Sequence, residues 1–107
     1  MKLNTLLAAT VLGLGLGMLT GGNATALDGA ELYKTKTCIA CHGANGDVPI
    51  MPNYPKLGGQ NAAYAVQQMK DIKSGARNNG MTAAMKGIMH LVSDEEMQAI
   101  ADWLATL

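Results

Sequence analysis

The feature that most constrains this chain is the pentapeptide Cys38-Ile39-Ala40-Cys41-His42, which contains the only two cysteines among its 107 residues. Two thiols at this spacing lie about one helical turn apart. Each can form a thioether with one of the two vinyl groups of a haem, and the next residue can place its imidazole on the iron. The motif therefore predicts covalent attachment of one haem through Cys38 and Cys41, with His42 as the proximal iron ligand.

Three other kinds of site also use pairs of cysteines. A structural disulfide would occupy both thiols and leave His42 without a task. A thioredoxin-like redox pair requires a βαβ setting, and that context is absent from this sequence. A zinc site requires about four ligands, and His90 is the one further histidine in the chain. Haem attachment is the interpretation that uses every functional group of the motif.

The first residues have the pattern of a secretory signal peptide. Lys2 supplies a positive start, residues 3–19 are uncharged and mostly apolar, and Ala24-Thr25-Ala26 is the small-x-small triplet that signal peptidase recognises. A retained membrane anchor is the alternative, but the stretch is short for a bilayer span of about 20 strongly apolar residues. We expect a cleaved signal peptide over residues 1–26, one domain over residues 27–107, and a periplasmic location.

Composition limits how the remaining domain can be stabilised. The chain contains no Phe, three Tyr and one Trp, so its own side chains offer few large groups to a core of this small size. A buried haem would supply a large rigid apolar body. Eight Lys plus Arg balance eight Asp plus Glu, and no basic stripe indicates nucleic acid. We therefore expect a monomer with no nucleic-acid partner and, after cleavage, no stable membrane insertion.

Helix signals divide the domain into helices and one long loop. Asp28 and Glu31 have the spacing of a capping box, at the start of a first helix that runs toward the cysteines. Residues 43–59 contain four glycines and three prolines, which predict an ordered loop. Asn61 and Gly75 are suited to begin and end a second helix, and the residues between them carry an apolar stripe.

The last helix has the most complete signal. Ser93 and Glu96 form an S-x-x-E capping box, and Asp94 and Glu95 place negative charge where the helix dipole favours it. The apolar residues that follow at helical spacing are Met97, Ile100, Ala101, Leu104 and Leu107. No segment shows convincing strand alternation. The sequence therefore predicts an all-α domain with terminal helices, a middle helix and long loops.

From Gly29 to Leu107 the chain resembles the class I c-type cytochromes, in particular small bacterial ones and the single haem units of bacterial dihaem cytochromes c. The resemblance is carried by Cys38 to Gly43, by Pro52-Asn53-Tyr54-Pro55-Lys56-Leu57-Gly58-Gly59-Gln60, by Arg77 followed by Met81-Thr82, and by Ser93-Asp94-Glu95-Glu96 leading to Ala101-Asp102-Trp103-Leu104. It implies a cytochrome c-like fold, with terminal helices packed around one covalently bound haem c.

The resemblance also implies a methionine thioether as the sixth ligand of the iron. It selects Met81, which follows Arg77 in a polar loop that can fold over the distal face of the haem. Met85 and Met89 continue a run of methionines at four-residue spacing, so they stay open as alternatives. So does His90, which would give a two-histidine site of lower potential. Arg77 could pair with a haem propionate or remain a solvated loop residue.

Two further contacts are implied by the same resemblance. A metal-bound histidine usually donates its second ring N–H to a carbonyl or carboxylate, which orients the ring. For His42 the expected acceptor is the backbone carbonyl of Pro52. Where the terminal helices cross, the residues expected to meet are Gly29, Tyr33, Trp103 and Leu104.

With both axial positions filled, the iron changes oxidation state without binding a substrate. This predicts a periplasmic monohaem electron carrier and not an enzyme. The expected partners are redox proteins such as a reductase, a dehydrogenase or a terminal oxidase, met through a small transient interface. A haem enzyme or gas-binding module is the second hypothesis, and rapid binding of carbon monoxide by the reduced protein would favour it. A subunit of a larger redox complex is the third.

Overall fold

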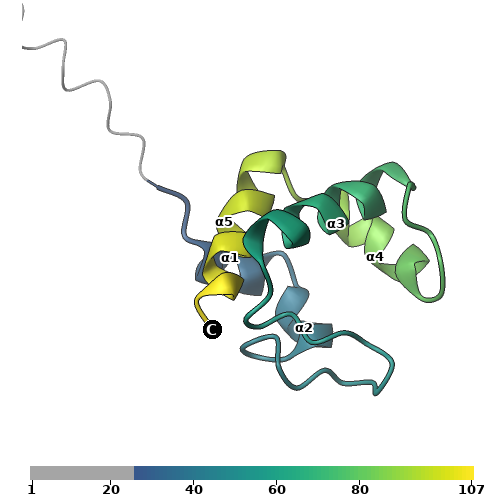
Figure 1. The fold of residues 1–107 in the computed structure, drawn as a ribbon, viewed down its shortest axis with the longest axis horizontal. Coiled ribbons are helices and arrows are strands. Elements are labelled where there is room, and N and C mark those ends of the chain that lie inside the picture. The colour runs from purple at the N-terminus through teal and green to yellow at the C-terminus, as the bar shows by residue number, and fades with distance from the viewer. Residues whose placement is uncertain (1–25) are drawn as a thin grey trace, which may run out of the picture.

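A computed structural model describes residues 26–107, which form five helices joined by loops (Figure 1). The helices are α1 (Gly29–Thr35), α2 (Cys38–His42), α3 (Ala62–Ser74), α4 (Thr82–Met89) and α5 (Asp94–Ala105). No described residue belongs to a β-strand, so the predicted all-α class is confirmed. Within this part of the chain, no helix combines the length and the apolar character needed to cross a membrane. The predicted signal peptide lies outside the described residues, apart from Ala26.

The crossing of α1 and α5 brings the two ends of the domain together (Figure 1). Gly29 makes the close approach possible, because a Cβ atom there would overlap the backbone carbonyl of Ala99 and lie 2.8 Å from the Cβ of Trp103. One turn further along α1, the ring of Tyr33 lies 5.0 Å from that of Trp103 between centroids, at an interplanar angle of 50°. The predicted packing of Gly29 and Tyr33 across the last helix is confirmed.

The predicted helix caps are also present. The Asp28 carboxylate accepts a hydrogen bond from the N–H of Glu31 at 3.1 Å, and the Asn61 side chain accepts one from the N–H of Tyr64 at 3.0 Å. Gly75 ends α3 in the left-handed conformation with φ of 88°. Each cap is a contact within four residues, so the sequence pattern alone could specify it.

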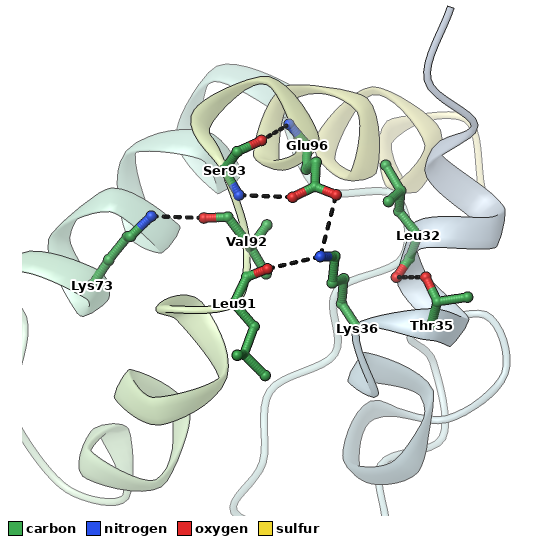
Figure 2. Close-up of polar contacts among 8 residues, drawn as sticks. All are labelled: Leu32, Thr35, Lys36, Lys73, Leu91, Val92, Ser93 and Glu96. Carbon is green, nitrogen blue, oxygen red and sulfur yellow. Dashed lines mark hydrogen bonds and ion pairs between the residues drawn. The ribbon is translucent and has the colours of Figure 1, made fainter.

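The capping box at the start of α5 has both of its bonds (Figure 2). The Ser93 hydroxyl accepts from the N–H of Glu96 at 3.2 Å, and the Glu96 carboxylate accepts from the N–H of Ser93 at 2.9 Å. The other carboxylate oxygen of Glu96 lies 3.3 Å from Nζ of Lys36. The last helix is therefore tied at its first turn to the segment between α1 and α2.

The first predicted helix is interrupted before the cysteines. α1 ends at Thr35, and Thr37 takes the left-handed conformation with φ of 68°, which is uncommon for a β-branched residue. The chain then restarts as the short helix α2. This break turns the cysteine motif away from the axis of α1, and no glycine or proline in the sequence signals it.

The helix α4 was not predicted, because its sequence lacks a capping signal. Met81 occupies the N-cap position without a side-chain hydrogen bond, and Gly87 lies within the helix. Its one periodic signal is the four-residue spacing of Met81, Met85 and Met89. Among the described helices, α4 packs against α3 alone.

The core lies where α1 and α3 each pack against α5, and α4 and its connection to α5 close one side of it (Figure 1). Its buried members are Tyr33, Cys38, Ile72, Met89, Val92, Met97, Ile100 and Leu104. One cysteine of the motif thus lies within the core itself, which positions the cavity described below.

We predict that Gly29→Ala destabilises the holoprotein by about 2 kcal/mol, since an added methyl group must displace the backbone of α5. The measurement is chemical denaturation followed by far-UV circular dichroism. The control is Gly87→Ala, because a Cβ at Gly87 meets no atom within 4 Å and alanine favours a helix. Equal stability of the two variants would contradict the close crossing of α1 and α5.

The Glu96 carboxylate makes the free energy of unfolding depend on pH. The hydrogen bond from the Ser93 N–H, with the Lys36 ion pair, holds its pKa below the ordinary value of 4.5. A carboxyl whose pKa is lowered by folding contributes stability above that ordinary value, and the contribution is lost as pH falls through the folded-state pKa.

We predict that Glu96→Gln lowers the free energy of unfolding at pH 7 by about 0.5 kcal/mol, since the ion pair is partly exposed to solvent. The difference from wild type should shrink toward zero as the pH is lowered below 4.5. Urea denaturation at a series of pH values measures it, with the exposed Glu95→Gln as control. A difference that stays constant down to low pH would refute the role assigned to this charge.

Candidate functional site

A cavity of about 430 Å³ is lined by residues from all five described helices and from the loop that follows α2. Its volume lies in the range of small-molecule and cofactor sites. The two cysteines and the histidine of the motif line it together with three methionines of the 81–89 segment. The apolar part of the lining includes Tyr33, Leu57, Ala65, Met69, Ile72, Ile88, Ile100 and Leu104. The sequence motif and the methionine run therefore meet in one largely apolar space.

The short helix α2 presents the motif to this cavity. Cys38 and His42 are buried, Cys41 is half-buried, and both cysteines are free thiols. Burial raises the pKa of the Cys38 thiol, so at neutral pH it is protonated. No disulfide joins the two thiols. Among residues 26–107, no group of three or more His, Cys, Asp or Glu side chains could hold a metal ion, so neither the disulfide nor the zinc alternative finds support there.

His42 is oriented by a backbone carbonyl, but not by the predicted one. Its Nδ1 lies 3.1 Å from the carbonyl oxygen of Pro55, so the expectation of Pro52 is wrong by three residues. A hydrogen bond from the Tyr54 N–H to the Met51 carbonyl closes a turn around Pro52, and the chain reaches His42 only after that turn. A bond at Nδ1 leaves Nε2 as the nitrogen available to a metal.

The environment of His42 favours a neutral imidazole. The side chain is 4% exposed, and its burial lowers the pKa of the ring, an effect that the Pro55 carbonyl partly opposes. A neutral imidazole is the form that binds a metal. Burial therefore favours the protonation state of His42 that a metal requires.

Tyr33 supports the motif from α1, a role that the sequence did not reveal. Its hydroxyl donates a 2.6 Å hydrogen bond to the carbonyl of Gly43, the residue directly after His42. Burial raises the pKa of Tyr33 to about 12, so the hydroxyl keeps its proton over the physiological range. Gly43 has φ of 86°, and a Cβ there would lie against the Val48 backbone, so glycine is required at this turn.

The candidates for the sixth ligand differ in burial. Met81 is 53% exposed at the start of α4, whereas Met85 is half-buried one turn later and packs against the core. Both line the cavity. Met89 also reaches the lining but is 1% exposed and belongs to the core. His90 is exposed and is not among the lining residues, so its position does not favour a two-histidine site.

Arg77 lines the cavity beside Gln68, a partner that the sequence did not indicate. Its Nη1 donates to the side-chain oxygen of Gln68 on α3 at 3.3 Å, and its backbone N–H donates to the Asp71 carbonyl at 3.0 Å. These bonds hold the guanidinium at the wall of the cavity. Its predicted pairing with a haem propionate stays a prediction.

These observations test whether the site fits a covalently attached haem. The cavity offers two thiols one helical turn apart, a buried neutral imidazole fixed through one nitrogen, thioether side chains and a mainly apolar wall. Residues 26–107 match the family model described as cytochrome c. The chain belongs to the cytochrome c family. The cofactor of this family is haem c, covalently attached and carrying iron, as the sequence predicted.

Individual relatives define the place of the chain within the family. It is 39% identical to cytochrome c4 of Pseudomonas aeruginosa over 97% of its own length and 49% of that protein. It is 37% identical to cytochrome c-553 of Nitratidesulfovibrio vulgaris, covering 78% of this chain and 80% of that one. A thiosulfate dehydrogenase electron acceptor of Stutzerimonas stutzeri is 34% identical over 84% of this chain and 44% of its own.

The coverage of these relatives is uneven. The chain spans about half the length of the Pseudomonas cytochrome c4, but most of the length of cytochrome c-553. The predicted membership, a small bacterial class I c-type cytochrome that resembles one unit of the dihaem cytochromes c4, is confirmed. The predicted cytochrome c-like fold is confirmed with it.

Proposed function

We propose that this protein is a periplasmic monohaem electron carrier that passes single electrons between redox partners through a haem c with histidine and methionine ligands. Membership of the cytochrome c family supports electron transfer by a c-type haem. The observation that carries the finer proposal is the meeting of Cys38, Cys41, His42 and the methionine side chains of the 81–89 segment around one cavity.

Each residue of the motif has a separate task in this proposal. Cys38 and Cys41 hold the haem by two thioether bonds, so the cofactor cannot dissociate. His42 binds the iron through Nε2, while the Pro55 carbonyl fixes the ring through Nδ1. When bound, the haem supplies an iron that alternates between ferric and ferrous states. The apolar wall excludes water from it.

Of the four candidates for the sixth ligand that the sequence left open, the structure supports Met81 and Met85. Met81 is the donor implied by the family resemblance. Met85 also lines the cavity, whereas Met89 is buried within the core. The partial burial of Met85 and its packing against the core support Met85, because a ligand held by its surroundings loses less side-chain entropy on binding. A thioether from either residue raises the potential relative to two histidines.

The partner is proposed from the relatives. Proteins of Stutzerimonas stutzeri and Thiomonas intermedia named thiosulfate dehydrogenase electron acceptor share 34% and 38% identity with this chain. We propose that a dehydrogenase donates electrons to this cytochrome.

A carrier with both axial positions filled should not bind carbon monoxide rapidly when reduced, whereas a gas-binding or catalytic haem should.

We predict that the ferric holoprotein shows the weak far-red band of an iron–thioether bond, that Met85→Ala removes this band, and that Met81→Ala retains it. Absorption spectra of the three proteins, each made with the haem-attachment machinery, test this directly. Loss of the band in Met81→Ala alone would assign the ligand to Met81. A wild type without the band would refute methionine ligation.

We predict that the exported protein begins after Ala26 and carries one covalent haem. Mass spectrometry of the intact product should show loss of residues 1–26 and a mass increase of one haem. Replacing both Cys38 and Cys41 by serine should abolish the increase but not the cleavage, because the signal peptide is recognised independently of the motif. A product that retains residues 1–26 would instead be a membrane-tethered cytochrome.

A further inference from the structure

The connection between α4 and α5 is held by two lysines from other parts of the chain (Figure 2). Nζ of Lys73, on α3, donates to the carbonyl of Val92 at 2.7 Å. Nζ of Lys36, from the segment between α1 and α2, donates to the carbonyl of Leu91 at 2.8 Å. Two consecutive carbonyls are thus bound by ammonium groups 19 and 55 residues away in sequence.

Both bonds satisfy backbone groups that have no helical partner there. α4 ends at Met89 and α5 starts at Asp94, so the carbonyls between them lie outside both helices. Val92 is 1% exposed, and a buried carbonyl without a partner costs free energy. Hydrogen bonds from a charged donor are stronger than neutral ones.

The Lys36 bond belongs to a wider network. The same ammonium group lies 3.3 Å from the Glu96 carboxylate, whose second oxygen accepts from the Ser93 N–H. Lys36 therefore joins the segment that precedes the cysteine motif to the last residues before α5. Lys73 acts from a different side, because it comes from α3, the helix against which α4 packs (Figure 2).

The helix α4 depends on such anchors more than the other long helices do. It packs against α3 alone among the described helices, and its N-cap residue offers no side-chain hydrogen bond. Its last residue, Met89, and Val92 in the connection that follows are each 1% exposed. Met81, its N-cap residue, and Met85, in its first half, are two of the three methionines of this segment that line the cavity. The position of the Met85 sulfur therefore depends on its packing against the core and on how firmly the far end of α4 is held.

We propose that Lys73 and Lys36 are positioning residues that fix the end of α4 and thereby hold its ligating methionine, Met85 or Met81, at the haem iron. Neither lysine lines the cavity, so each acts through the backbone of the connection and not on the cofactor. The role rests on the proposed methionine ligation, but the anchoring of α4 can be measured separately from it.

The experiment compares Lys73→Met and Lys36→Met holoproteins with Lys70→Met, an exposed lysine on the same helix as Lys73. Hydrogen exchange reports the opening of each helix. We expect the amides of α4 to exchange about tenfold faster in Lys73→Met, since a bond from a charged donor is lost. Exchange in α1 should change less. Lys73→Arg should restore most of the protection, because a guanidinium can donate to the same carbonyl.

A second readout follows the iron–sulfur bond. In Lys73→Met the far-red thioether band should disappear on heating several degrees below the temperature at which the far-UV circular dichroism signal is lost. In Lys70→Met the midpoint temperatures of these two transitions should stay as close as in wild type. Lys36→Met should show the same separation of the two transitions. It should also lose hydrogen-exchange protection at the start of α5, because Glu96 loses its ion-pair partner.

Either of two results would overturn the proposal. The first is exchange of α4 in Lys73→Met that equals exchange in Lys70→Met. The second is equal acceleration in all helices with no separation of the two melting curves, which would indicate general destabilisation. A wild type that lacks the thioether band would refute methionine ligation and the positioning of a ligand with it, while the exchange comparison would still decide whether these lysines hold α4.

Discussion

The close crossing of α1 and α5 is the contact on which the rest of the structure depends. It requires Gly29, since the backbone of α5 occupies the space of any side chain there. The crossing buries Tyr33 against Trp103, and the hydroxyl of Tyr33 binds the carbonyl directly after His42. A glycine at one end of the domain is thereby linked, through one tyrosine, to the position of His42, the proposed iron ligand.

The two sides of the cavity are held in different ways. The side with His42 is fixed by the short helix that carries the motif and by the loop after it, which brings the Pro55 carbonyl to the ring. The side with the methionines is carried by α4, which packs on α3 alone among the helices of residues 26–107 and is anchored at its far end. The two sides that carry the proposed iron ligands are therefore held by different sets of contacts.

Burial determines the protonation of the groups around the cavity. It lowers the pKa of His42 and raises those of Cys38 and Tyr33, so all three are neutral at physiological pH. Lys36 and Lys73 lie outside the cavity lining, where they neutralise no buried charge but satisfy backbone carbonyls, whereas the lining itself includes Lys56 and Arg77. The buried titratable groups of the attachment motif and of Tyr33 are therefore uncharged, which suits a cofactor that must exchange electrons without admitting water.

Local features of the sequence determined the class of this protein: the attachment motif, the caps at Asp28, Asn61 and Ser93, and the glycine that ends α3. Each is a contact within a few residues, so its spacing can be read directly. Tertiary structure decided the rest. Pro55 replaced Pro52 as the partner of His42, α4 formed without a cap, and Met85 joined Met81 on the cavity wall. These outcomes depend on how loops and helices distant in sequence pack, and single-sequence spacing does not encode that packing.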